Sequence, residues 1–277
     1  MRRWRHWSQR LKRLREVSRV IRLAISPCPN DTFMFDAIVN RRIDCGDFEF
    51  DVTYLDIEQL NASALEQTFD ITKCSTALLP AIYDRYLLLD SGSALGRGNG
   101  PLLVRRKGET APLRHIAVPG EHTTANALVK RLFPEIESRS PRLFSEIATS
   151  VERGEYDGGV LIHEGRFVYH KSNLVLVADL GIEWERRTSL PLPLGAIVAS
   201  RELEGDVRRD IEALLRRSIA YAFEHPIHSR DYIKSHAQEL DDEVIDSHIA
   251  LFVNDYSLSL GKEGIRAIEQ LTGLKIM

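Results

Sequence analysis

The stretch VIRLAISPCPNDTFMFDAIV, residues 20–39, predicts a strand, a rigid turn and a helix in immediate succession. Its apolar run at 20–25 is typical of a short buried strand, and the apolar residues of 33–39 recur at helical spacing. Two prolines in the turn fix φ and hold the residues before them extended. Three short polar residues just before the helix are good N-caps, because their oxygens accept from free N–H groups: Asn30, Asp31 and Thr32. In open α/β sheets, ligands bind beside such strand-to-helix turns.

Strands and helices alternate along most of the chain. Residues 47–56 and 69–75 have the pattern of strands, and a helical pattern follows each of them. The order restarts at residue 115 and continues to a strand at 156–165, while the tail from 203 is mainly helical. Alternation of this kind predicts an α/β protein with parallel sheets and right-handed crossovers.

Two extended segments divide this pattern into two groups. They lie near 103–107 and at 189–200, so the chain is expected to leave a first α/β lobe, form a second and return. A cleft between two such lobes is a favoured place for a ligand. The predicted division is a basic extension at 1–19, lobe one at 20–106 and 195–277, and lobe two at 107–194.

Composition excludes several classes of protein. Hydrophobic residues make up 43% of the 277, enough for a core, and no apolar run reaches the ~18 residues that span a membrane. Residues 1–22 carry a net charge of +8, which leaves −11 on the rest, so no nucleic-acid-binding surface is expected on the body. Three well-separated cysteines and the lack of a secretory signal predict reduced thiols in the cytoplasm.

The basic extension at 1–19 allows three interpretations. Trp4, Trp7 and Leu11 fall at helical spacing, which fits an amphipathic helix on a membrane or RNA. The other two are a disordered extension and translated sequence upstream of the true start. The high charge favours these two, because such sequence rarely packs on a core.

Polar residues follow four predicted strands, where they would face a common cleft: Ser26 to Thr32, Lys73 to Ser75, Glu121 to Thr124, and His163. Each has a plainer interpretation. The hydroxyls can cap helices, Lys73 can be a solvated charge, and His163 can be a hydrogen-bonded structural residue. His163 ends the apolar run GGVLI, which places it at a strand end. Because imidazole ordinarily titrates near neutral pH, a histidine there suits a general base.

No metal or nucleotide motif emerges from the sequence. The loop GSALGRGNG at 92–100 lacks the G-K-[ST] ending of a phosphate-binding loop. His225 and His228 have neither helical spacing nor an evident third ligand. Neither a metal nor another cofactor is therefore expected.

Five segments resemble the 1,4-dihydroxy-6-naphthoate synthase family, which cleaves cyclic dehypoxanthinylfutalosine in the futalosine route to menaquinone: SPCPNDTFMFDAIV, DITKCSTALLPAI, GSALGRGNGPLLV, PGEHTTANALVKRLFP and GVLIHEGRFVY. They occur in the family's order at similar spacing, and the resemblance spans about 21–277. It implies a carbon–carbon lyase without a metal or redox cofactor. It also implies a two-lobed type II periplasmic-binding-protein-like fold with a central cleft.

The resemblance further implies roles for individual residues. His163 matches the family's catalytic base, and Asn30 is the expected contact from the opening stretch. Two other segments match substrate-binding positions: Lys73, Cys74, Ser75, Thr123 and Thr124. The implied substrate is a small molecule with an aryl carboxylate, which helix N-termini with hydroxyl caps suit. We expect His163 to remove a proton from its sugar-derived part, after which aromatisation drives carbon–carbon cleavage.

Two alternatives stay open. One is the chorismate-dehydrating sister enzyme of the same pathway, although DITKCS and LIHEG resemble the naphthoate synthase more closely. The other is a cytosolic protein that binds a small carboxylate without chemistry, since an exported one would carry a signal peptide. A homodimer is compatible with each of these functions.

Overall fold

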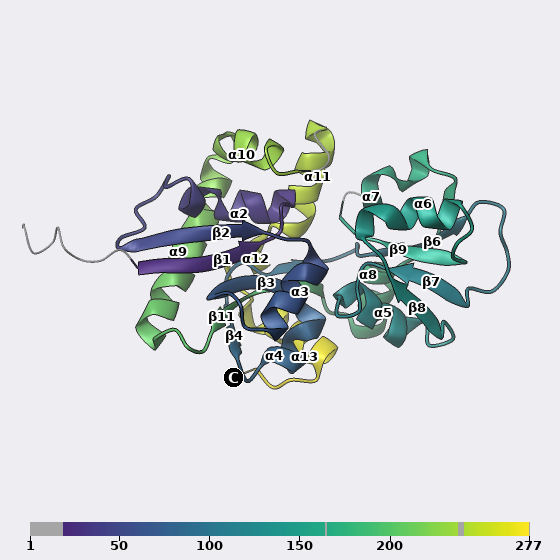
Figure 1. Ribbon diagram of the computed structural model, residues 1–277, viewed down its shortest axis with the longest axis horizontal. Helices are drawn as coiled ribbons and strands as arrows, with labels where there is room; N and C mark the ends of the chain where they lie inside the picture. Colours follow the sequence, from purple (N-terminus) through teal and green to yellow (C-terminus); the bar gives the residue numbers. More distant parts are fainter. Residues whose placement is uncertain (1–18, 164, 238–240, 277) are drawn as a thin grey trace, which may run out of the picture.

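The computed structural model describes residues 19–163, 165–237 and 241–276. Within these residues, two β-sheets with their helices lie at opposite ends of the long axis of the molecule (Figure 1). The predicted extension at 1–19 falls outside the described residues except for Arg19, which begins the first strand. No helix of the described part is long and apolar enough to cross a membrane.

The first sheet has the order β2-β1-β3-β11-β4, and β5 also pairs with β11. Its strands are β1 (Arg19–Ile25), β2 (Phe48–Tyr54), β3 (Ile71–Ser75), β4 (Tyr86–Leu88), β5 (Ala94–Gly96) and β11 (Leu192–Ser200). The first three run parallel, as predicted, whereas β11 runs antiparallel to β3, β4 and β5. Because β1 and β3 are parallel neighbours, the polar residues that follow them lie at the same edge of the sheet.

The second sheet has the order β10-β6-β9-β7-β8. Its strands are β6 (Leu102–Arg106), β7 (His115–Val118), β8 (Ser138–Pro141), β9 (Gly158–Leu161) and β10 (Leu174–Asp179). Strand β7 runs parallel to β8 and β9, while β6 runs antiparallel to β9 and β10. The predicted parallel pairing is therefore found in part of each sheet, whereas β6 and β11 run antiparallel to the strands beside them.

The chain first crosses from one sheet to the other before β6, whereas the sequence predicts this crossing after residue 106. The predicted boundary at 106 assigns β6 to lobe one, but β6 makes its hydrogen bonds with β9 and β10 of the second sheet. An extended apolar segment has the same sequence pattern whichever sheet it joins. Strand pairing favours a crossing before Leu102, and the full set of lobe boundaries stays a prediction.

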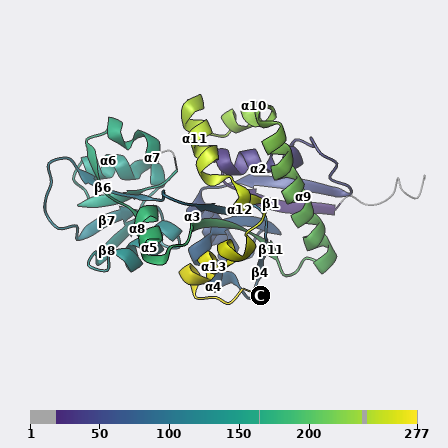
Figure 2. The same cartoon turned by 180° about the vertical axis from the view of Figure 1, so that it is seen from behind.

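Helices pack against both sheets (Figure 1), and from behind the helices of the tail lie over the first sheet (Figure 2). The α-helices are α2 (Pro29–Val39), α3 (Ile57–Leu65), α4 (Leu79–Ile82), α5 (Thr124–Leu132), α6 (Ile147–Glu152), α7 (Gly165–Val168), α8 (Leu180–Thr188), α9 (Gly205–Glu224), α10 (Arg230–Lys234), α11 (Asp242–Phe252), α12 (Asp255–Leu258) and α13 (Gly261–Thr272). Four 3-10 turns complete the described elements: η1 (Thr76–Leu78), η2 (Phe144–Glu146), η3 (Tyr169–Lys171) and η4 (Pro226–Ser229).

Strand β11 shows how one strand contributes to two cores. Ile197 and Ala199 pack on one face with side chains of α2 and α9, while Ala196 and Val198 pack on the other with α4 and α13. This alternation is the period of two expected of a strand covered on both faces. Burial of each larger aliphatic side chain stabilises the fold by roughly 1.5–3 kcal/mol, so the strand ends that carry the polar residues rest on a rigid base.

The helix after β1 begins at Pro29 rather than at Phe33. Its N-cap is Cys28, which makes no side-chain capping bond. A proline suits the first helical position, because the N–H that it lacks would have no partner within the helix. The three polar residues predicted as caps, Asn30 to Thr32, lie instead inside the first turn and are buried.

Candidate active site

A pocket of about 690 Å³, its open mouth included, is lined by residues from the two sheets and from the helices that pack on them. Six of the seven residues predicted for the site line this pocket: Asn30, Lys73, Ser75, Thr123, Thr124 and His163. The seventh, Cys74, does not. They come from the start of α2, the end of β3, the start of α5 and the turn after β9. The four junctions that the sequence singles out therefore meet at one place.

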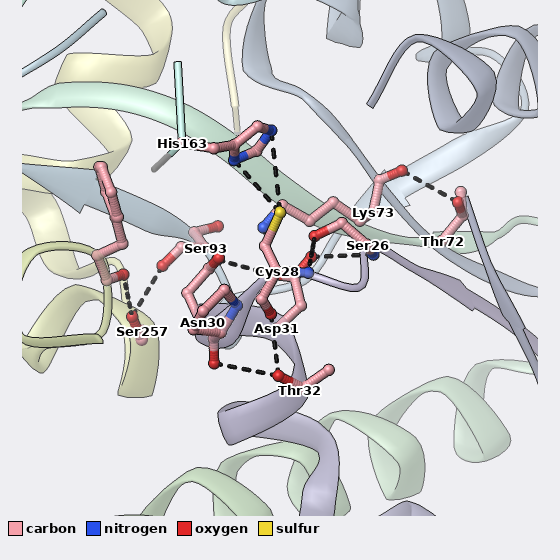
Figure 3. Close-up of polar contacts among 12 residues, drawn as sticks. Ser26, Cys28, Asn30, Asp31, Thr32, Thr72, Lys73, Ser93, His163 and Ser257 are labelled. Carbon is pink, nitrogen blue, oxygen red and sulfur yellow. Dashed lines mark hydrogen bonds and ion pairs between the residues drawn. The ribbon is translucent and has the colours of Figure 1, made fainter. Parts of the chain in front are cut away.

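Lys73 on β3 lines the pocket, and its ammonium pairs with the buried carboxylate of Asp31 (Figure 3). The plainer interpretation of Lys73 as a solvated charge is therefore wrong. Asp31 also accepts from the hydroxyl of Ser26 at 2.6 Å and from the side-chain amide of Asn30 at 2.8 Å. Gly195 makes room for Lys73, since a Cβ there would lie 2.9 Å from Lys73 Cε. A buried charge needs such partners, so this network fixes the shape of the opening turn.

Ser75, at the end of β3, is fixed by Asn61 of α3. Asn61 Nδ2 donates to Ser75 Oγ at 3.0 Å, and the N–H of Ser75 donates to Asn61 Oδ1 at 2.8 Å. Ser75 makes no side-chain capping bond to η1, so its predicted capping role is wrong. Because its oxygen accepts from Asn61, the hydroxyl proton can donate to a bound ligand.

Thr123 caps α5, as the sequence predicts. Its Oγ1 accepts from the N–H of Asn126 at 3.2 Å and donates to the carbonyl of Gly120 at 2.9 Å. Thr124 donates to the carbonyl of Leu194 at 2.7 Å and so ties α5 to β11. Both hydroxyl protons are thus used within the protein. The start of α5 lines the pocket, where its first N–H groups and its dipole favour an anionic group.

The side chain of Cys74 lies away from the pocket, in the core beside Leu78 and Ile82. It is fully buried, and burial raises the pKa of its thiol to about 12. Side chains alternate along β3, so Lys73 and Ser75 lie on the pocket side and Cys74 on the other. The Cys74 side chain therefore does not face the pocket.

His163 follows β9 with a φ of 52°, in the left-handed region that non-glycine residues rarely adopt. Its Nδ1 lies 3.3 Å and its Nε2 3.9 Å from Cys28 Sγ (Figure 3). The ring meets Phe144 edge to face, with ring centroids 5.0 Å apart. A second pocket of about 630 Å³ is lined by His163, Cys28 and Phe144 among others, so His163 belongs to the walls of both pockets.

His248 of α11 also lines the first pocket, although nothing in the sequence points to it. It is 1% exposed, its Nε2 lies 3.0 Å from Asn30 Oδ1, and its ring stacks on His163 at a centroid distance of 6.2 Å. Burial lowers the pKa of His248 well below its usual 6.5, and nearby His163 and Lys73 add to the effect. Since Asn30 Nδ2 donates to Asp31, we assign the proton of the neutral ring to Nε2.

Arg166 is a second pocket residue that was not predicted, although it lies in the segment GVLIHEGRFVY. Its Nη1 lies 2.6 Å from Asp179 Oδ2 and donates to the carbonyl of Gly100 at 2.6 Å. These bonds tie α7, which follows His163, to the end of β10 and to the segment between β5 and β6. The described residues contain no group of three or more His, Cys, Asp or Glu side chains placed to hold a metal ion.

Two α/β sheets joined by crossing strands, with a pocket lined from both, define a protein of the periplasmic-binding-protein-like class. A crystal structure of an Archaeoglobus fulgidus protein superposes with a TM-score of 0.83 at 33% identity, covering 91% of this chain and 95% of that one. The ligand-binding component of an ABC-type import system from Staphylococcus aureus, solved with zinc bound, has a TM-score of 0.68 at 12% identity and coverages of 91% and 90%. A Candida albicans protein with the generic periplasmic binding protein fold gives 0.68 at 13%, with coverages of 91% and 89%. The last two show the fold alone, and the predicted fold class is confirmed.

The chain belongs to the menaquinone biosynthesis family, whose model matches residues 21–275. Two curated relatives are named 1,4-dihydroxy-6-naphthoate synthase. The one from Thermus thermophilus is 46% identical over 91% of this chain and 92% of its own length, and the one from Streptomyces coelicolor is 41% identical over 91% of each. The resemblance seen in the sequence is confirmed, and the chain is an enzyme of menaquinone biosynthesis.

Proposed function

We propose that this enzyme is the carbon–carbon lyase that converts cyclic dehypoxanthinylfutalosine to 1,4-dihydroxy-6-naphthoate, with His163 as the general base. The observation that carries the proposal is the placement of His163: a strand-end histidine, in a left-handed backbone conformation, in the walls of two pockets. Rare backbone conformations of this kind gather at active sites. The names of the two curated relatives support the product.

The aryl carboxylate of the substrate would lie where α5 begins and β3 ends. The first-turn N–H groups of α5 and the hydroxyl of Ser75 are donors there, and each bond to a charged group contributes ~1.5–3 kcal/mol. Lys73 has three N–H donors and shares its charge with Asp31, so it can donate to the carboxylate as well. Asn30 has a second N–H beyond the one that meets Asp31, and this donor suits a polar group of the substrate.

His163 would then take a proton from the sugar-derived part of the substrate. The electron pair released by this step drives cleavage of the carbon–carbon bond, and the remaining ring becomes aromatic. A positioned base contributes ~10²–10⁴-fold in rate. The neutral state of His248 supports this role, because a second cation stacked on His163 would oppose its protonation.

A product assay tests the proposal. Purified protein is incubated with cyclic dehypoxanthinylfutalosine and, in a parallel arm, with chorismate, and both mixtures are followed by mass spectrometry. Release of 1,4-dihydroxy-6-naphthoate is the expected result. Dehydration of chorismate would instead identify the sister activity of the same pathway. If calorimetry shows that cyclic dehypoxanthinylfutalosine binds but no product forms, the protein binds a carboxylate without catalysing a reaction.

We also propose that the enzyme acts in the cytoplasm on a small-molecule substrate. The three cysteines all lie in the described part of the chain and none forms a disulfide, as expected in a reducing compartment. A homodimer stays a prediction. Sedimentation of the full chain would measure the oligomeric state.

A further inference from the structure

Cys28 and His163 form a thiol–imidazole pair from two distant parts of the chain. Cys28 is the N-cap of the 11-residue helix α2, and His163 follows β9 of the other sheet. Their side chains meet with Sγ 3.3 Å from Nδ1 (Figure 3). The mechanism proposed above uses the imidazole as a base and assigns no part to the thiol.

Two features of this position favour the thiolate of Cys28. The imidazole can take the thiol proton, and the start of α2 places the positive end of a helix beside the sulfur. The buried carboxylate of Asp31 in the same turn is paired with Lys73, so it does not oppose a thiolate with a net negative charge. Thiolates, rather than thiols, are the nucleophiles in cysteine chemistry.

The other two cysteines have the opposite surroundings. Cys45 Sγ lies near the carbonyls of Ile38 and Ile43, at 3.9 and 3.6 Å, and burial raises the pKa of its thiol. Cys74 lies in the core, where burial raises its pKa further. The chain therefore contains two cysteines that serve as internal references for the first.

A path to Cys28 exists through the second pocket. This pocket of about 630 Å³ is lined by Cys28 and His163. Its other walls include Tyr54 of β2 and Leu143, which follows β8. Cys28 as a residue is only 6% exposed, so a reagent reaches it through the pocket rather than from open surface.

We propose that Cys28 is a reactive thiol activated by His163, and that soft electrophiles such as alkyl halides and maleimides modify the enzyme at this residue. With iodoacetamide, the thiol proton moves to Nδ1 and Sγ attacks the methylene carbon. The carbon–sulfur bond forms as the carbon–iodine bond breaks, iodide leaves, and the imidazolium returns its proton to water. A label on Cys28 would lie against His163, which lines both pockets, so modification should also inhibit turnover.

The test is a labelling experiment on the folded full-length chain. Protein is treated with iodoacetamide at pH 7, and the alkylation rate of each cysteine is read from peptide masses at timed quenches. We expect Cys28 to react at least about tenfold faster than Cys45 and Cys74. Equal rates at the three cysteines in protein that keeps its native circular dichroism would overturn the proposal.

Two variants assign the cause of the reactivity. His163→Asn should slow labelling of Cys28 about tenfold, whereas His170→Asn, which removes an exposed histidine after α7, should leave it unchanged. An unchanged rate in a folded His163→Asn protein would refute activation by the imidazole. If that variant does not fold, the comparison of the three cysteines in the unmodified sequence still tests whether Cys28 is the reactive thiol. Labelling needs no substrate, so its outcome is independent of whether the proposed lyase reaction is observed.

Discussion

His163 lies among side chains that come from three different elements. Cys28 is the N-cap of α2, Phe144 lies in η2 and His248 lies in α11, and each of these side chains lies against the imidazole ring. The φ of 52° at His163 is therefore maintained by its surroundings rather than by local preference. Asparagine tolerates the left-handed region better than other polar residues, so it is the substitution that disturbs the backbone least.

His163→Asn should lower kcat by ~10²-fold or more, because it removes a general base. Substrate should still bind with nearly unchanged Kd, since the donors for its carboxylate lie on β3 and α5. Single-turnover kinetics and calorimetry measure the two quantities, with His170→Asn as the matched control. Turnover near the normal rate would mean that His163 is structural and that the proposed base is wrong.

The burial of His248 predicts that the free energy of unfolding depends on pH. Its pKa is lowered in the folded state, so below about pH 6.5 the unfolded chain binds a proton that the folded chain does not. Stability should therefore fall as the pH falls, by up to about 1.4 kcal/mol per pH unit from this residue alone. Above pH 7 the contribution is constant.

Urea unfolding of the normal protein and of His248→Gln between pH 5.5 and 7.5 checks this. The glutamine can still donate to Asn30 but cannot titrate, so the variant should lose less stability on acidification. Equal pH slopes for the two proteins would show that His248 does not contribute.

At the scale of elements, the site is built from the ends of strands and the starts of helices. The end of β3 presents Lys73 and Ser75, and the start of α5 presents N–H groups with Thr123 as its cap. The two hydroxyls thus have different tasks. Ser75 keeps a proton for a ligand, whereas the proton of Thr123 is given to the carbonyl of Gly120.

This difference predicts that two alanine substitutions have different effects on KM. Ser75→Ala should raise KM about tenfold or more, through the loss of one hydrogen bond to a charged group, and it should also lower Tm because Asn61 Nδ2 loses its acceptor. Thr123→Ala should leave KM nearly unchanged but destabilise the fold by ~0.5–2 kcal/mol through the lost cap, and Thr123→Asn should restore stability because asparagine also caps. Thermal melts and steady-state kinetics on the three variants separate the effects. A large rise in KM for Thr123→Ala would contradict the capping assignment.

The lack of a side chain at Gly195 on β11 leads to a second prediction about how the elements pack. A Cβ at this position would lie 2.9 Å from Lys73 Cε, so Gly195→Ala should displace Lys73 and weaken its pairing with Asp31. We expect substrate affinity to fall and stability to drop by ~1–3 kcal/mol, the usual cost of overpacking. Gly205→Ala is the control, since a Cβ there meets only flexible arginine ends at 3.6 Å. Equal behaviour of the two variants in binding and melting would contradict this account.

At the scale of the whole molecule, the described fold begins at Arg19. Its ladder with β2 starts at the pair Arg19 and Phe48, and Ile21 is already part of the core. A chain that starts at Arg19 should therefore keep its kcat/KM, whereas one that starts at Leu23 loses four of the seven residues of β1 and should fail to fold. Activity assays and circular dichroism compare the two. A tenfold loss in the first chain would show that residues 1–18 belong to the active unit.

The sequence predicts most of the strands and helices and six of the residues that line the pocket. These features depend on local signals: alternation of apolar residues, prolines in turns, and polar residues at strand ends. Local signals also mislead at particular positions. The polar residues of the opening turn look like caps but lie inside the helix, and Cys74 shares a segment with Lys73 but faces the core.

The sequence by itself determined the α/β class, the two groups of elements and the strand ends that carry the site, because periodicity is set within a few neighbouring residues. Only the tertiary structure decided which side chains meet. The partnership of His248 with Asn30 joins residues 218 positions apart, and β6 joins the second sheet through pairing that its own residues do not specify. Contacts of this range depend on how helices pack across the sheets, and a neutral buried histidine arises only once that packing has excluded water.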